Sequence, residues 1–331
     1  MLQAAFLLTG DRPWPRVSDD VTATSGPAVR EMLDDGLRCE KAGMTERALE
    51  HYQSALEHSL DPALISEALR RQAHVYRNRC DWDLAIVAAQ DSARAAESAR
   101  SAELLAEAWN AEAAVYQSRG DFETAIPLYE LMLVTVPVGR IRGVALQNLA
   151  GIYGRQARFG EAAHCFEDAY AAFEAAEDRW GMAHVLNNLG CLALDRGELG
   201  RAEATLQRAT DLAREIQDLD LLAIARLNYA EALLARGELP KAEIEVSGSL
   251  GHFVVAGNEF RRTECLRVLG DIALQQEQTG PARRFYQSGL DIAAAIGARV
   301  ISEQLAARIA GLPPADAPEE DSRAEGQSAV D

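Results

Sequence analysis

Residues 184–209 read HVLNNLGCLALDRGELGRAEATLQRA, and residues 224–249 read IARLNYAEALLARGELPKAEIEVSGS. The two stretches share the segment RGEL and place an alanine, Ala202 or Ala242, at a separation of 40 residues. A fixed period of this length is typical of proteins built from stacked copies of one supersecondary unit. The repeat decides the fold, because a single such unit cannot bury its apolar face without a neighbour.

The same frame occurs seven times along the chain. A Gly or Ala stands twelve residues before each anchor alanine, and a large apolar residue stands four after it, with Ala89 as the exception. Apolar residues within each copy follow the i, i+3, i+4, i+7 spacing of two amphipathic helices. The small residues allow two helix backbones to approach closely, and the large one fills the space beside them. The anchors lie 37 or 40 residues apart, at Ala48, Ala85, Ala125, Ala162, Ala202, Ala242 and Ala282.

Turn residues separate the two helices of each copy. In four copies a glycine is placed to end the first helix, because glycine adopts the left-handed conformation at little cost. Asp81 and Asp121 are predicted to cap the helices that follow them. The four glycines are Gly43, Gly120, Gly197 and Gly237.

This pattern resembles the tetratricopeptide repeat. The third copy matches it most fully, since it carries Trp109, Tyr116, Ala125, Tyr129 and Pro137 in the family's characteristic positions. Most intervals are 40 residues, longer than the family's usual period of about 34. This long form is similar to the repeats of kinesin light chain and of the sensor domains in some bacterial regulators.

The resemblance implies an all-α, right-handed α-solenoid of about seven helical hairpins over residues 27–297, whose first helices line a concave face. The amphipathic residues 298–311 are expected to form a C-terminal capping helix. Residues 1–26 lack periodicity and are interpreted as an irregular N-terminal arm, either poorly ordered or forming a capping strand. Residues 312–331 are Pro-rich and acidic, and are predicted to be disordered.

One helix of the array is expected to be weak. Residues 239–257 carry Gly248 and Gly251 inside the helical pattern. Each glycine costs roughly 0.5–1 kcal/mol relative to alanine in a helix interior. We therefore predict that this helix is the least stable part of the array.

Composition and missing motifs exclude several classes of function. The net charge of −18 repels nucleic-acid phosphates and anionic lipids, so neither nucleic acid nor a membrane is expected as a partner. The five cysteines form no C-x-x-C pair and the six histidines no ligand-spaced pair, so we expect no metal site and a reducing, cytoplasmic location. No phosphate-loop, nucleophile-elbow or metalloprotease motif occurs, so we expect a protein that is not an enzyme, with no catalytic residue and no cofactor. Lysine supplies only Lys41 and Lys241 among 33 basic residues, which suggests a GC-rich bacterial genome.

The groove-facing positions implied by the resemblance carry a distinctive set of polar residues. One copy places four basic or potentially basic groups within two helical turns, and three others repeat an asparagine at 40-residue intervals. An asparagine amide offers both a donor and an acceptor, which suits it to holding an extended peptide main chain. The predicted groove residues are Arg70, Arg71, His74, Arg77, Asn110, Gln147, Asn148, Arg155, Asn187, Asn188 and Asn228.

Two alternatives compete with a binding role for these residues. The asparagines can hydrogen-bond to a neighbouring helix of the same array. The arginines can form surface ion pairs with Glu67, Asp81 or Asp83, each worth only a few tenths of a kcal/mol.

We interpret the chain as a non-enzymatic module that holds a protein or peptide segment, favouring an acidic one, in its concave groove. The first alternative is a peptide-sensing regulatory module related to the repeat domains of bacterial transcription regulators. The second is an accessory subunit of an enzyme complex.

Overall fold

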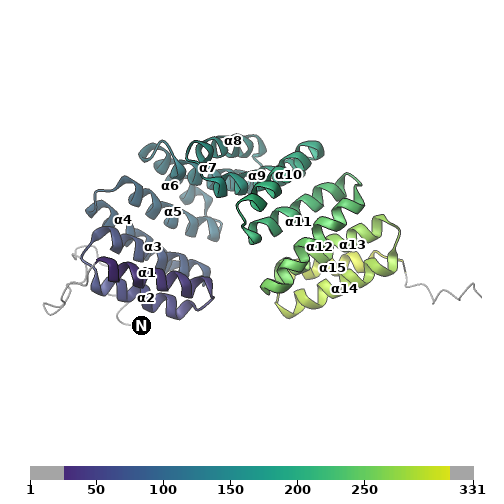
Figure 1. The fold of residues 1–331 in the computed structure, drawn as a ribbon, viewed down its shortest axis with the longest axis horizontal. Coiled ribbons are helices and arrows are strands. Elements are labelled where there is room, and N and C mark those ends of the chain that lie inside the picture. Colours follow the sequence, from purple (N-terminus) through teal and green to yellow (C-terminus); the bar gives the residue numbers. More distant parts are fainter. Residues whose placement is uncertain (1–25, 314–331) are drawn as a thin grey trace, which may run out of the picture. The chain divides into compact units, whose positions relative to one another are not determined.

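The structure is a computed structural model that describes residues 26–313. The predicted arm before Gly26 and the tail beyond Pro313 lie outside the described residues. Across residues 26–313 the chain forms fifteen α-helices and no strand (Figure 1). The prediction of an all-α solenoid of helical hairpins with a C-terminal helix is confirmed.

The chain divides into two compact units, with the boundary between Gly181 and Met182. The helix α9 (Arg179–Asp195) contains this boundary. The other helices of unit 1 are α1 (Gly26–Lys41), α2 (Thr45–His58), α3 (Pro62–Asn78), α4 (Trp82–Ser98), α5 (Ala102–Arg119), α6 (Phe122–Thr135), α7 (Arg140–Arg155) and α8 (Phe159–Ala175). Those of unit 2 are α10 (Leu199–Glu215), α11 (Leu219–Ala235), α12 (Leu239–Ala256), α13 (Glu259–Gln275), α14 (Thr279–Ala295) and α15 (Arg299–Ala310).

Sequential helices pack as antiparallel hairpins inside each unit. In unit 1 the first helices of neighbouring hairpins also contact one another, α1 with α3, α3 with α5 and α5 with α7. In unit 2, α11 contacts α13 in the same way, and α15 packs on α14. Each unit therefore has an inner face made by the first helices of its hairpins.

The recurring small and large residues form the hairpin cores as the spacing predicts. All seven anchor alanines are fully buried. A Cβ atom added at Gly36 would collide with the ring of Tyr52, and one at Gly270 would collide with the ring of Tyr286. The glycines therefore let the first helix lie against the large residue of the second.

The turn inside each hairpin has one residue with positive φ, five positions before the anchor alanine. The four predicted glycines are confirmed there, with φ between 71° and 81°. In the other three hairpins the position is held by Cys80, Ala157 and Glu277, with φ of 61°, 57° and 62°.

The two predicted helix caps have different outcomes. Asp121 accepts a hydrogen bond from the Thr124 N–H at 3.2 Å, which confirms it as the N-cap of α6. The prediction for Asp81 is wrong, because its side chain makes no capping bond at α4. Asp81 occupies the N-cap position of α4, but its Oδ2 lies 3.0 Å from the Arg79 Nε in an ion pair.

Gly248 has a packing role that the sequence alone does not reveal. The guanidinium of Arg226 on α11 lies against α12 at this glycine, where any Cβ would collide with it. From there Arg226 Nε donates to Glu245 Oε2 at 2.7 Å, and its Nη2 donates to the Ile244 carbonyl at 3.2 Å. Glycine thus gives an arginine access to the main chain of α12.

Candidate functional site

The inner face of unit 1 contains a hollow of about 320 Å³ between α1, α3 and α5. The hairpin geometry creates it, because the first helices of three successive hairpins lie side by side there. Five of the eleven predicted groove residues line this hollow, namely four from α3 and Asn110 from α5. The lining residues are Leu37, Glu40, Lys41, Arg70, Arg71, Ala73, His74, Arg77, Glu107, Asn110, Ala111 and Ala114.

Three of the α3 side chains in the hollow are engaged with carboxylates. Arg70 Nη2 lies 3.0 Å from Glu107 Oε2 on α5. Arg71 Nη2 lies 3.8 Å from Glu67 Oε1, one turn earlier on the same helix, so the ion-pair alternative is correct for this residue. His74 contacts Glu40 on α1 through its Nδ1.

Glu40 lines the hollow and is contacted by two other side chains, Tyr52 and His74. The Tyr52 hydroxyl donates to its Oε2 at 2.8 Å, while His74 contacts the other oxygen. Partial burial alone would raise the pKa of Glu40, but the hydrogen bonds from His74 and Tyr52, with the positive charges of His74 and Arg71, lower it overall. Glu40 is thus held as a carboxylate, and the packing tyrosine of the first hairpin orients it.

Arg77 is the exception among the four α3 groups. It forms no ion pair within the part of the chain that the structure describes, and its Nη2 reaches only the Asn78 Oδ1 at 3.5 Å. Partial burial lowers the pKa of Arg77, opposed by the charges of Tyr129 and Glu40. This half-buried guanidinium retains most of its five N–H donors for another group.

The hollow has a surplus of positive charge although the chain is strongly acidic. Its lining includes Lys41 and three arginines against two carboxylates, a formal balance of +4 and −2, or +2 with His74 neutral. Lys41, like Arg77, has no ion-pair partner among residues 26–313. The other two lining arginines each face a carboxylate, Arg70 facing Glu107 and Arg71 facing Glu67, which lies outside the lining.

The predicted asparagines pair with one another across neighbouring first helices. In unit 1, Asn148 Nδ2 on α7 donates to Asn110 Oδ1 on α5 at 2.9 Å. In unit 2, Asn228 Nδ2 on α11 donates to Asn187 Oδ1 on α9 at 2.8 Å. Asn187 in turn donates to Asn188 Oδ1 at a long 3.5 Å. The alternative that these residues bond to a neighbouring helix is therefore correct for both pairs.

These bonds use only part of the capacity of each amide. An asparagine has two N–H donors and two acceptor lone pairs, and Asn148 uses one donor on Asn110. Asn110, Asn148, Asn188 and Asn228 are half-buried, whereas Asn187 is buried. Four of the five therefore remain within reach of a ligand on the inner face.

The remaining two predicted residues lie on α7 outside the hollow. Gln147 is half-buried. Arg155 is exposed at the end of the helix, with its guanidinium carbon 5.9 Å from the centre of the Phe122 ring.

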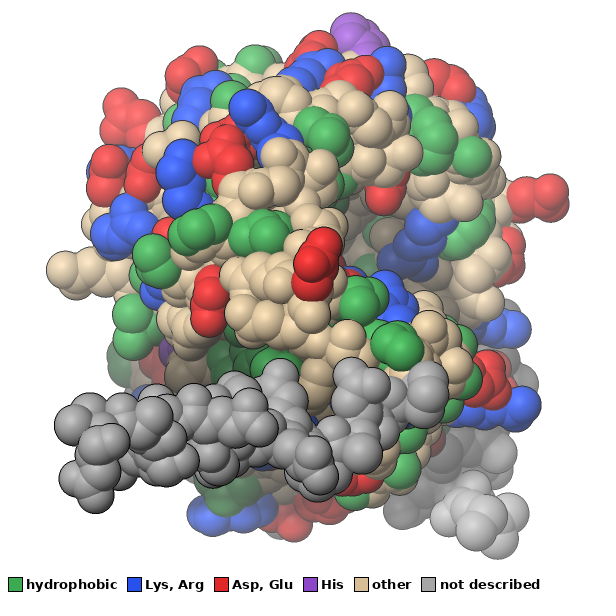
Figure 2. Space-filling view, turned by 90° about the vertical axis from the view of Figure 1, so that its right-hand side faces the viewer, with side chains coloured by type: hydrophobic (Ala, Val, Ile, Leu, Met, Phe, Trp, Pro, Cys, Tyr) green, Lys and Arg blue, Asp and Glu red, His purple; other side chains and the backbone are tan. Residues whose placement is uncertain are grey.

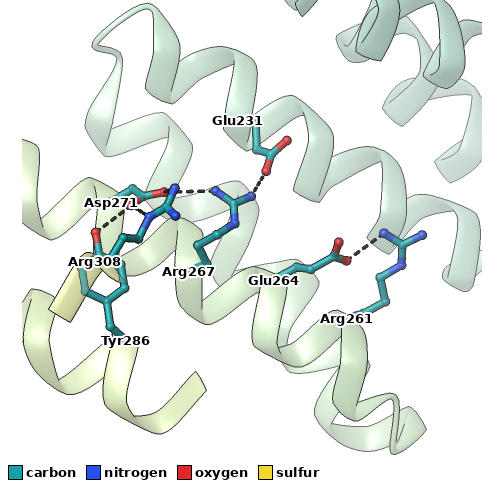
Figure 3. A network of polar contacts seen from close by, with 7 residues as sticks. All are labelled: Glu231, Arg261, Glu264, Arg267, Asp271, Tyr286 and Arg308. Carbon is teal, nitrogen blue, oxygen red and sulfur yellow. Dashed lines mark hydrogen bonds and ion pairs between the residues drawn. The ribbon is translucent and has the colours of Figure 1, made fainter. Parts of the chain in front are cut away.

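The first helices of unit 2 carry a charged network that the sequence reading missed (Figure 3). Arg267 contacts Glu231, and its Nη1 lies 3.0 Å from Asp271 Oδ2. Asp271 Oδ1 also accepts from the Tyr286 hydroxyl at 2.6 Å and from Arg308 Nε of α15 at 2.8 Å. The i, i+4 spacing of Arg267 and Asp271 could have indicated their ion pair from the sequence. No spacing indicates that Arg308 joins them, because it lies after the last hairpin.

This network is electrically neutral, in contrast to the hollow of unit 1. It combines three arginines with three carboxylates when Arg261 and Glu264, 2.8 Å apart, are included. Basic and acidic side chains are likewise interspersed over the face of the molecule shown in Figure 2. Surplus positive charge is therefore a property of the hollow and is not shared by this network.

Neither a metal site nor a membrane-spanning helix is found within residues 26–313. No group of three or more His, Cys, Asp or Glu side chains there is arranged to hold a metal ion. None of the described helices combines the length and the apolar character needed to cross a bilayer.

Comparisons with known proteins agree with this architecture. The family model for the tetratricopeptide repeat matches residues 142–215. No curated protein sequence matches the chain. Several solved structures are similar to it in fold, all at low sequence identity.

Three of these structures illustrate the likeness. BtubC (BKLC) from P. vanneervenii is 21% identical, with a TM-score of 0.54 over 70% of this chain and 92% of that one. The apo form of the quorum sensor NprR from B. thuringiensis is 14% identical, with a TM-score of 0.62 over 80% of this chain and 76% of that one. A Rap protein complexed with Competence and Sporulation Factor is 16% identical, with a TM-score of 0.59 over 88% of this chain and 76% of that one.

Such identities establish likeness of fold alone. The hairpin frame recurs seven times, its small and large residues pack as that frame requires, and the family model matches its central copies. Residues 142–215 are tetratricopeptide repeats, and the recurrence of the same frame supports this assignment for the other copies.

Proposed function

We propose that the chain is a non-enzymatic binding module that holds an acidic, extended peptide or protein segment against the inner face of unit 1. The observation that carries this proposal is the surplus positive charge in the hollow of a chain whose net charge is −18. Concentrating unpaired cations in a concave site costs stability through repulsion, and a bound anion removes that cost. The preferred ligand is therefore one with carboxylate groups.

Arg77 and Lys41 are the groups proposed to meet the ligand's carboxylates. Both lack an ion pair among the described residues, and the guanidinium of Arg77 can form two parallel hydrogen bonds to one carboxylate. Arg70 and Arg71 already face Glu107 and Glu67, so they contribute to the potential of the hollow more than to direct contact.

The unused amide groups of Asn110 and Asn148 are proposed to hold the ligand's main chain. Asn110 lines the hollow, and its bond to Asn148 extends the polar surface to α7. Because the two amides fix each other's orientation, their remaining donors and acceptors are already ordered before a peptide arrives. This lowers the entropy cost of binding.

A peptide-sensing regulatory role is the second candidate, favoured by the likeness to a quorum sensor and to a Rap protein complexed with Competence and Sporulation Factor. A sensor changes shape when its ligand binds, whereas a rigid holder does not. A change in the solution scattering radius on saturation with ligand would support the sensor. An unchanged radius would support the holder.

The binding proposal is tested with a fluorescein-labelled oligoglutamate peptide, titrated with the protein by fluorescence anisotropy. We expect Arg77→Ala to weaken binding by about tenfold or more, the effect of losing a charge-assisted bond of about 1.5–3 kcal/mol. The triple substitution of Arg70, Arg71 and Arg77 by alanine should weaken it further and flatten its dependence on salt.

The matched control is Arg284→Ala, which removes one exposed positive charge from α14 on unit 2. It should leave the affinity unchanged, and an oligolysine peptide of equal length should not bind. If Arg77→Ala binds oligoglutamate as tightly as the control variant does, the hollow is not the binding site.

A further inference from the structure

The second helix of the third hairpin, α6, differs from its six counterparts in the residue types at two positions. The two positions six and nine residues after the anchor alanine are occupied by large apolar side chains only in α6. The corresponding pairs are Ser54 and Glu57 in α2, Asp91 and Arg94 in α4, Leu131 and Val134 in α6, Asp168 and Ala171 in α8, Arg208 and Asp211 in α10, Gly248 and Gly251 in α12, and Ser288 and Asp291 in α14.

These apolar side chains are exposed and aligned. Leu131 is 42% exposed, Val134 80%, and Val138, in the loop after the helix, 74%. With the exposed Pro127, the residues Leu131 and Val134 follow the i, i+4, i+7 spacing of one helix face, and Val138 lies three residues beyond the end of α6 at Thr135. We name these four residues the α6 stripe. Large exposed apolar patches mark contacts with other polypeptide segments.

Two carboxylates border the α6 stripe. Glu123 and Glu130 are exposed and stand four residues before Pro127 and Val134, on the same side of the helix. Neither forms an ion pair within residues 26–313. Seven residues of helix separate them, so they stand about 10 Å apart along α6. A segment that covers the stripe should therefore carry an apolar group between two cations.

The chain's own N-terminal segment has this composition. Residues 12–16 read RPWPR, so that Trp14 lies between Arg12 and Arg16. The two prolines favour an extended backbone, in which four residues span about 12 Å. The spacing of the two arginines thus matches that of Glu123 and Glu130, and the indole falls over the apolar residues between them.

The length and position of the segment allow it to reach α6. It joins the structure at Gly26, the start of α1, in the same unit as α6. Antiparallel hairpins place the start of α1 and the end of α6 at the same edge of unit 1. The two helices are two hairpins apart, about 20 Å at usual helix spacings. Twelve residues from Trp14 to Gly26 can span up to about 40 Å.

We propose that residues 12–16 pack on the α6 stripe of the same chain, with Trp14 against Leu131 and Val134 and the two arginines against Glu123 and Glu130. Two other occupants, a second copy of the chain and an unrelated protein, are separate outcomes of the test.

The test is photocross-linking of the full chain with p-benzoylphenylalanine in place of Trp14, at low protein concentration. We expect a cross-link within the monomer, which mass spectrometry locates between residues 127 and 138. The double variant Leu131→Glu with Val134→Glu should reduce its yield at least fivefold. Ser288→Glu, at the equivalent exposed position of α14, is the matched control and should leave the yield unchanged.

Charge reversal provides a second measurement. Glu123→Arg with Glu130→Arg should reduce the cross-link, and adding Arg12→Glu with Arg16→Glu should restore it. Circular dichroism checks that every variant retains its helices. A cross-link that forms only between chains and disappears on dilution would assign the stripe to a second copy. Absence of any cross-link to α6, or one that is insensitive to the double variant, would overturn the proposal.

Discussion

Gly270 on α13 and Tyr286 on α14 show how a single missing Cβ determines a helix contact. The ring of Tyr286 lies where the Cβ of any other residue at position 270 would stand, and its hydroxyl continues to Asp271 at 2.6 Å. Gly36 and Tyr52 repeat the arrangement in the first hairpin. The tyrosine is therefore a packing residue that also positions a carboxylate on the inner face, a link that its apolar spacing alone did not predict.

Gly270→Ala should destabilise the protein by about 1–3 kcal/mol, the usual cost of overpacking a buried contact. The matched control is Gly251→Ala on α12, where the added Cβ meets nothing within 4 Å. That change should stabilise the protein by up to about 1 kcal/mol through helix propensity. Urea denaturation measures both, and equal effects of the two substitutions would contradict the packing argument.

Most packing residues could be identified from the sequence, because they recur at fixed spacing. The side-chain pairings could not, since they depend on which groups meet across helices distant in sequence. Asn110 and Asn148 are 38 positions apart, and Arg308 reaches Asp271 from outside the repeats. Sequence spacing identifies inner-face residues, but it does not show that asparagines there bond to one another.

At the scale of the element, the hairpin turns share one backbone conformation but not one residue type. Ala157 adopts φ of 57° at the position where Gly197 adopts 71°. The left-handed region is unfavourable for residues with a Cβ by roughly 1 kcal/mol. Three of the seven turns therefore carry a strain that the glycine turns lack, and only the structure shows that these turns keep the same geometry without glycine.

Ala157→Gly should relieve that strain and raise the free energy of unfolding by up to about 1 kcal/mol, because the release of strain outweighs the entropy gained by the unfolded chain. The reverse change, Gly197→Ala, should lower it by about 1 kcal/mol. Thermal unfolding followed by circular dichroism compares the two. A loss of stability in Ala157→Gly would show that the turn is not strained.

The helix α12 remains predicted to be the least stable of the array. Gly248 is retained for Arg226, and Gly251 faces open space, so α12 lacks two side chains that could stiffen it. We expect its amides to exchange with deuterium faster than those of α10 and α14, the second helices of the two adjacent hairpins. Hydrogen exchange read by mass spectrometry measures this. Equal protection of the three helices would refute it.

At the scale of the whole molecule, repeat arrays are held together by contacts between neighbours only, so distant parts can unfold separately. The four tryptophans, Trp14, Trp82, Trp109 and Trp180, all precede the boundary between the two units. Trp180 stands at the start of α9, the helix that contains the boundary, so tryptophan fluorescence reports on unit 1 and on the start of this helix, whereas circular dichroism reports on both units.

Gly270→Ala, which acts in unit 2, should shift the denaturation midpoint measured by circular dichroism and leave the fluorescence midpoint nearly unchanged. The wild-type protein, measured by both methods under the same conditions, provides the reference. Equal shifts by the two methods would mean that the units unfold as one cooperative body.

The contact between Arg308 and Asp271 has a consequence for how such an array can lengthen. Arg308 belongs to α15, and it gives Asp271 of the last hairpin a partner that no further hairpin supplies. A duplicated hairpin inserted upstream would leave this junction intact. One appended after residue 297 would separate the arginine from its carboxylate and leave the half-buried Asp271 with Arg267 and Tyr286 alone. Growth of the array by internal duplication is therefore easier than growth at its end.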